Sequence, residues 1–162
     1  MITSTPTTVD YLQHLLEQPQ SMPGLLITDQ SALSTIAETT GTLCLTASQA
    51  LCAHHEGTLP KAATAVVDGN ALFEQSALVL PLISQLRDVL AARVFVIAAS
   101  KEDAVLRRSA LISLGFHRAE VSVENAGKRP WYIFEMAHYK VTPDWLNARH
   151  WANPELWDKF RW

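Results

Sequence analysis

Short apolar runs that alternate with helical patterns constrain the fold of this chain more than any other feature. The runs cover residues 25–28, 43–45, 63–67 and 93–100. Between them, apolar residues recur at helical spacing, most clearly over residues 78–90, where Leu, Val and Ile repeat at i, i+1, i+4 and i+5. Strands that alternate with helices predict a mainly parallel sheet with helices on both faces.

The pattern changes in the last third of the chain. Residues 116–124 alternate between apolar and polar side chains, residues 125–128 predict a turn, and the segment "WYIFEMAHY" (131–139) predicts the returning strand. We therefore expect a three-layer α/β fold that closes with a C-terminal antiparallel β-hairpin. The length of 162 residues indicates a single domain, residues 1–162, with a Trp-rich tail over 142–162.

Local signals set the expected helix boundaries. Thr8 is a candidate N-cap for a first helix that ends before the segment 22–24. Ser100 and Asp103 have the spacing of a capping box, so a helix is expected from about residue 103 to residue 114. Gly115 is expected to terminate that helix.

Composition excludes several classes of function. The net charge is −3 and the hydrophobic fraction is 48%, so nothing suggests the basic surface of a nucleic-acid-binding protein. No apolar run approaches the ~20 residues of a membrane span, and the first residues lack the features of a signal peptide. Only two cysteines occur. We expect a cytoplasmic protein that binds neither nucleic acid nor membrane.

Four segments together resemble a known family. The segments are "AVVDGNALFEQ", "RVFVIAAS", "ALISLGFHRAE" and "WYIFEMAHYK". In this order they are similar to the class I S-adenosylmethionine-dependent methyltransferase fold, whose last two strands form a hairpin with an antiparallel final strand. The resemblance covers about residues 24–140. The chain also resembles a family of uncharacterised short proteobacterial proteins that end in a segment like "NPELWDKFRW".

Two cofactor-binding features of the methyltransferase family are missing from this chain. The family has an acidic-Gly-x-Gly loop after its first strand, where bare backbone approaches the ligand, but this chain has "TDQSALS". The family has an acidic residue after its second strand, where this chain has "LCLTASQA". The residues that could still line a cofactor pocket are Asp29, Thr46, Asp68 and Ser100.

These observations favour a non-catalytic binding or interaction protein on a degenerate methyltransferase-like, Rossmann-like fold. No catalytic residue, metal ligand or cofactor is predicted for it. The alternative is an S-adenosylmethionine-dependent methyltransferase with an atypical cofactor pocket, in which Asp68 and the backbone near Asp29 would hold the cofactor. Asp68 follows a central strand, where open α/β sheets bind ligands, although Asp and Gly are also ordinary turn residues.

Three other site hypotheses carry less weight. Asp29, Asp68 and Ser100 resemble the acidic and hydroxyl positions of a phospho-receiver domain, but the expected terminal hairpin does not fit that fold. The segment 52–56 contains Cys, His and Glu without the ligand spacing of a zinc site. No nucleophile elbow surrounds Ser48 or any other serine.

Two groups of side chains are candidates for surface contacts. The basic residues are interpreted as solvated surface charge: Arg107, Arg108, Arg118, Lys128 and Arg129. The tryptophans of the tail either cover the protein's own sheet or form a docking surface for a protein partner or a second copy of the chain: Trp145, Trp151, Trp157 and Trp162.

Overall fold

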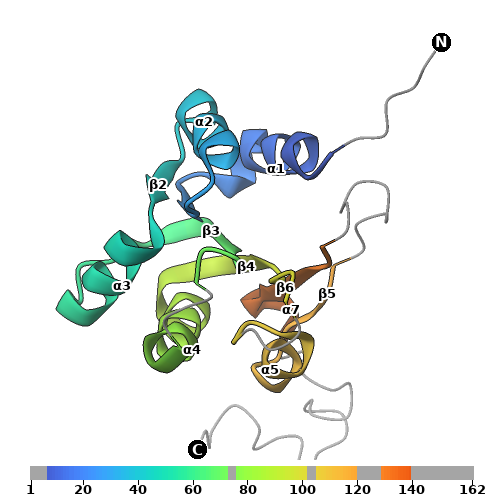
Figure 1. Ribbon diagram of the computed structural model, residues 1–162. Coiled ribbons are helices and arrows are strands. Elements are labelled where there is room, and N and C mark those ends of the chain that lie inside the picture. Colours follow the sequence, from blue (N-terminus) through green and yellow to red (C-terminus); the bar gives the residue numbers. More distant parts are fainter. Residues whose placement is uncertain (1–6, 73–75, 102–104, 120–128, 140–162) are drawn as a thin grey trace, which may run out of the picture.

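A computed structural model describes residues 7–72, 76–101, 105–119 and 129–139 of the chain. Its described strands form one sheet in the order β2-β1-β3-β4-β6-β5 (Figure 1). The strands are β1 (Gly24–Ile27), β2 (Leu43–Leu45), β3 (Ala62–Asp68), β4 (Ala91–Ile97), β5 (His117–Arg118) and β6 (Trp131–Glu135). The first four run parallel to one another, and β6 is antiparallel to both β4 and β5. The predicted α/β class and the antiparallel C-terminal strands are confirmed.

Helices cover both faces of the sheet. The longer ones are α1 (Thr8–Glu17), α2 (Ser31–Thr40), α3 (Ala47–Glu56) and α4 (Ser76–Gln85), which continues as the π-helix η2 (Leu86–Leu90). The shorter ones are η1 (Pro19–Ser21), α5 (Arg108–Ser113) and α7 (Met136–Tyr139). In Figure 1, α1 and α2 lie on one side of the sheet, while α3, α4 and α5 lie on the other.

The strands are buried on both faces because their side chains alternate between two hydrophobic clusters. On β4, Val94 and Val96 contact the cluster under α3, α4 and α5, whereas Phe95 and Ile97 contact the cluster under α1 and α2. On β6, Trp131 lies in the α1–α2 cluster, where its ring meets Tyr11 edge-on at a centroid distance of 5.0 Å. The antiparallel strand is therefore part of the same core as the parallel ones.

Two helices begin with a capping box, in which side chains satisfy backbone groups that the first turn leaves unpaired. For α1 the pair is Thr7 and Asp10, so the predicted N-cap, Thr8, is wrong by one residue. For α3 the pair is Thr46 and Gln49. The capping hydrogen bonds with Thr7 lower the pKa of Asp10 from its ordinary value.

Two predicted elements differ from the structure. The helix expected from residue 103 begins only at Arg108, although Gly115 follows its end with φ of 85° as expected for a helix terminus. The strand expected over 131–139 ends at Glu135, which is the last β6 residue with a partner on β4, and residues 136–139 form α7 instead.

The strand order defines a topological switch point between β1 and β3. The chain leaves β1 through α2 to reach β2 on one side, then returns through α3 to reach β3 on the other side. Ligands of open α/β sheets bind in the crevice beyond the carboxyl ends of the strands at such a point. Among the described helices, none has the length and apolar character needed to cross a membrane.

Candidate functional site

Asp68 is the centre of the switch point, and it is fully buried. Its Oδ2 accepts a hydrogen bond from the Thr28 hydroxyl, at the end of β1, at 3.2 Å. Its Oδ1 accepts one from the backbone N–H of Asn70 at 3.1 Å. A buried carboxylate needs such partners because water cannot reach it. Asp68 therefore links β1, β3 and the turn that follows β3.

Arg129 supplies the positive charge that Asp68 requires. Its Nη2 donates to Asp68 Oδ1, and the two side chains form an ion pair with exposed fractions of 17% and 0%. The same guanidinium donates through Nε to the carbonyl of Ala98 at 2.8 Å. The basic residue just before β6 thus joins the carboxyl ends of β3 and β4, and it is not the solvated surface charge that the sequence suggested.

The turn after β3 is also tied to the end of β4. The backbone N–H of Ser100 donates to Asn70 Oδ1 at 2.8 Å, and Asn70 Nδ2 donates to the Ser100 hydroxyl at 3.2 Å. The N-cap of α5 is Arg107 and not Ser100. Gly69 packs so tightly that a Cβ built on it would lie 2.7 Å from both the Ala99 nitrogen and the Ile97 oxygen.

Asp29 and Thr46 lie together at the beginning of α3. Asp29 Oδ1 accepts a hydrogen bond from the backbone N–H of Ala47 at 2.9 Å, and Thr46 accepts one from Gln49. Both residues thus complete a helix N-terminus, where negative charge is favourable. No non-glycine residue in the described chain has positive φ, so the turn from Asp29 to Gln30 needs no glycine for its conformation.

The structure therefore brings together only some of the predicted site residues. Asp68 and Ser100 belong to one network through Asn70, and Asp29 and Thr46 belong to the α3 cap. The four tail tryptophans lie outside the described residues, so their role in docking stays a prediction. No group of three or more potential metal ligands occurs within the described ranges.

The cysteine and histidine residues of α3 have ordinary partners. His54 Nδ1 contacts Gln85 Oε1, on α4, at 2.5 Å. The Cys52 thiol donates to Glu56 Oε1 at 3.4 Å, and this hydrogen bond to a carboxylate raises the pKa of Cys52. A raised pKa reduces the thiolate fraction, which disfavours a nucleophilic role for Cys52.

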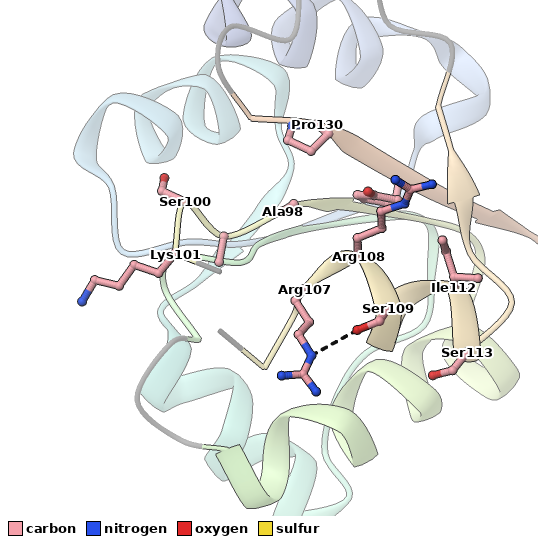
Figure 2. Close-up of a pocket in the computed structure, with 11 residues that line it drawn as sticks. Ala98, Ser100, Lys101, Arg107, Arg108, Ser109, Ile112, Ser113 and Pro130 are labelled. Carbon is pink, nitrogen blue, oxygen red and sulfur yellow. Dashed lines mark hydrogen bonds between the residues drawn. The ribbon is translucent and has the colours of Figure 1, made fainter. Parts of the chain in front are cut away.

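A hollow of about 730 Å³ lies next to this hydrogen-bond network, between the carboxyl end of β4, α5 and the start of β6. Figure 2 shows the side chains around it. The residues that line it are Ala98, Ala99, Ser100, Lys101, Arg107, Arg108, Ser109, Ile112, Ser113, Pro130 and Tyr132. Among the described residues of this lining, three side chains are cationic and none is a carboxylate, a composition that favours an anion.

The two arginines of this hollow differ in their surroundings. In Figure 2 they leave the start of α5 in opposite directions, with Arg107 held to Ser109 and Arg108 on the side of Pro130. Arg107 Nε donates to the Ser109 hydroxyl at 3.1 Å. Arg108 is exposed, and no ion pair joins it to a carboxylate of the described chain. The Lys101 side chain extends away from both arginines.

The sequence alone did not single out this hollow. Arg107 and Arg108 were recognised as basic residues and Lys101 was not, and the hollow depends on α5 starting at Arg108 and on Pro130 lying beside it. A signal for Arg129 did exist, because an Asp at the end of a buried strand requires a cation. Nothing in the local sequence showed that the cation would come from a residue 61 positions away.

The fold and the network place the chain in a class, that of three-layer α/β proteins with an antiparallel strand within the C-terminal part of the sheet. The model of a family of unknown function, DUF6231, matches residues 6–162, so the chain belongs to this family. No curated protein and no solved structure matches the chain.

Proposed function

We propose that this chain is a non-catalytic binding protein that holds an anionic small molecule in the hollow beside α5. The observation that carries the proposal is the lining of the hollow, in which Arg107 and Arg108 face no carboxylate among the described lining residues. The hollow also lies at the carboxyl end of β4, the edge at which α/β sheets bind their ligands.

The chemistry of the lining favours an anion with an apolar body. A guanidinium presents several N–H donors in a planar fork that matches phosphate and carboxylate oxygens. Ile112, Pro130 and Tyr132 add apolar surface to the same wall. The volume of about 730 Å³ lies within the range typical of small-molecule sites, roughly 300–1,000 Å³.

The contacts of the other polar groups support a binding role over a catalytic one. Asp68 is saturated by Thr28, Asn70 and Arg129 and has no exposed surface. General acid–base catalysis needs a titratable group within reach of the substrate. The described lining of the hollow contains no carboxylate, histidine or cysteine, and its titratable side chains are those of Lys101, Tyr132 and the two arginines.

The methyltransferase alternative is favoured by one observation, the position of the antiparallel strand. In this chain β6 lies between β4 and β5, next to the edge of the sheet, and the resembled family also has a final antiparallel strand that forms a hairpin with the one before it. In that case S-adenosylmethionine would bind near Asp29, Thr46 and Asp68. It would have to displace the hydrogen bonds that these residues make within the protein.

A thermal-shift experiment separates the two functions. The purified protein is heated with phosphate, ATP, NAD, S-adenosylmethionine or S-adenosylhomocysteine near millimolar concentration. A ligand present at about a hundred times its Kd adds about 2.7 kcal/mol, a shift of several degrees for a chain of this size. We expect the phosphate-bearing ligands to raise the Tm, and the Arg108→Ala variant to lose that increase.

Lys61→Ala is the matched control, because Lys61 is exposed just before the amino end of β3 and the variant loses the same charge. An increase that persists in Arg108→Ala would contradict the proposed site. An increase with either adenosyl compound that Asp29→Ala abolishes would favour the methyltransferase. No shift with any ligand would contradict both functions.

We also propose the cytoplasm as the compartment. Cys44 and Cys52 are the two cysteines of the chain and are not joined in a disulfide, and thiols stay reduced in the cytosol. Fractionation of cells that express a tagged chain would test this, and recovery in a secreted or periplasmic fraction would contradict it.

A further inference from the structure

A second hollow lies next to the first. It has a volume of about 300 Å³ and is lined by Arg108, Ile112, Phe116, His117, Arg118 and Tyr132. Arg108, Ile112 and Tyr132 line both hollows. The two spaces are therefore neighbours that share one wall, and both are lined by cationic side chains without a carboxylate among their described residues.

The shared wall has a simple origin. Arg108 and Ile112 are four residues apart on α5, so their side chains lie on one face of the helix. Tyr132, on β6, lies in the hydrophobic cluster on the α5 side of the sheet. The helix face and the strand thus border both hollows.

Arg118, on β5, adds a further cationic side chain to the second hollow. It is the cross-strand partner of Tyr132 in the antiparallel pair of β5 and β6. Directly opposed residues of such a pair project to the same face of the sheet, with Cβ atoms about 5 Å apart. Arg118 therefore projects toward α5, as Tyr132 does. The order of cations along the groove is Arg107, Arg108 and Arg118.

We propose that the two hollows form one groove that binds a single elongated small molecule with at least two anionic groups, one on each side of Arg108. This inference rests on the proposed function and extends it to the class of ligand. A monoanion would occupy the first hollow and leave the charge of Arg118 unused. A diphosphate or a longer polyphosphate would contact Arg108 from both sides and reach Arg118.

Isothermal titration calorimetry tests the length of the site. Orthophosphate, pyrophosphate and tripolyphosphate are titrated into the protein at constant ionic strength, so that screening is equal for all three. We expect wild-type affinity to rise by about tenfold or more from orthophosphate to pyrophosphate. Succinate and adipate, titrated under the same conditions, determine whether dicarboxylates fill the same groove.

Three variants test which arginine contacts which part of the ligand. We expect Arg118→Ala to keep the wild-type affinity for orthophosphate and to lose the increase for pyrophosphate. We expect Arg108→Ala to weaken every probe and Lys61→Ala to weaken none. Arg118 and Lys61 are both exposed, so each variant should keep the wild-type Tm without ligand, within the small range typical of surface substitutions.

The failures of the two proposals are distinguishable. If Arg118→Ala keeps the full increase for pyrophosphate, the elongated groove is wrong, while the anion site at Arg108 stands. If the wild-type protein binds orthophosphate and pyrophosphate equally well, the same conclusion follows. If it binds none of the phosphates or dicarboxylates, both the groove and the proposed function are overturned.

Discussion

Two stretches of the same sheet edge use their polar residues in opposite ways. At the carboxyl ends of β1 and β3, the polar side chains bond to the protein itself, and Asp68 has no exposed surface. At the carboxyl end of β4, beside α5, arginines line a hollow of about 730 Å³. The first stretch is the expected ligand site of an α/β fold, and here it is filled by protein contacts.

The difference shows that the position typical of a ligand site need not hold the side chains that could bind a ligand. The strand order places the switch point between β1 and β3, but the carboxylate there accepts hydrogen bonds from Thr28 and Asn70 and pairs with Arg129. Buried polar groups are paired in stable proteins, so a carboxylate saturated in this way contributes to the fold. The proposed function therefore places the ligand where charged groups remain accessible, as they do in the hollow beside α5.

The largest expected effect comes from removing the Asp68 carboxylate at the ends of β1 and β3. Asp68→Ala leaves the Arg129 guanidinium without its partner, and loss of one member of a buried pair typically costs about 3–5 kcal/mol. Urea unfolding of wild type and variant would measure this loss. The double variant Asp68→Leu with Arg129→Met should recover part of it, because no charge is left unpaired.

A small effect of Asp68→Ala would break the comparison. It would mean that the crevice between β1 and β3 is already hydrated and that Asp68 is free to hold a ligand. Lys61→Ala, which removes an exposed charge, is the control and should stay within about 0.5 kcal/mol of wild type.

The second effect concerns the close contact between Gly69, after β3, and the backbone at the end of β4. In Gly69→Ala the new Cβ would lie 2.7 Å from two backbone atoms, the Ala99 nitrogen and the Ile97 oxygen. Backbone atoms of paired strands move reluctantly, so we expect a loss of about 1–3 kcal/mol in the free energy of unfolding, as for other overpacked sites. Thermal and urea unfolding both measure it.

Gly57→Ala is the contrasting control. Gly57 has φ of 70° and no atom near the position of a new Cβ, so its substitution causes backbone strain alone, roughly 1–2 kcal/mol. Both variants could lose the same free energy of unfolding while the backbone amides of β3 and β4 exchange hydrogen faster in Gly69→Ala than in wild type. That result would mean that the ends of these strands relax to accept the methyl group. The contact at Gly69 would then be more easily relaxed than its short distances indicate.

The third effect separates structure from binding at Asp29 and Thr46. Each caps α3, and loss of such a cap typically costs about 0.5–2 kcal/mol. We therefore expect Asp29→Ala and Thr46→Ala to lower the Tm and to leave the ligand-induced shift unchanged. Ser48→Ala, an exposed position on the same helix, should change neither. A reduced ligand shift in Asp29→Ala alone would indicate a cofactor at the switch point.

Much of the fold could be predicted because it follows from local patterns. The run over residues 43–45 is β2 to the residue, and the alternation along β3 and β4 follows from burial on both faces. The end of β6 could not be predicted in this way. Met136 continues an apolar segment and β4 extends past Arg93 to Ala91, yet β6 stops at Glu135 and α7 begins at Met136.

The candidate site could be predicted only in part. The position of Asp68 at the end of a central strand followed from the pattern, while its partner Arg129 depends on how β6 pairs with β4. Likewise, Arg107 and Arg108 were visible as basic residues. Their place beside a hollow depends on the late start of α5 and on the bonds between Ser100 and Asn70, which are contacts between distant residues.

The smallest expected effect concerns the end of α5, which supports the open stretch. Arg87, on η2, forms a bidentate pair with Asp88, at 2.5 and 2.9 Å, and donates to the carbonyl of Leu114 at 2.5 Å. The hydrogen bonds from Arg87 lower the pKa of Asp88. Asp88→Asn removes this pair, and because the Asp88 side chain is 48% exposed, we expect a loss within the range of surface pairs, about 0–1 kcal/mol.

The pH dependence identifies the cause of that loss. A folded-state pKa below the ordinary value of 3.8 means that the ionised Asp88 stabilises the fold above about pH 4 and that this stabilisation is lost as the pH falls further. The difference between wild type and Asp88→Asn, measured by urea unfolding, should be constant between neutral pH and pH 5 and shrink below pH 4. A difference that persists at pH 2.5 would show that packing of the side chain, and not its charge, holds Arg87 against the end of α5.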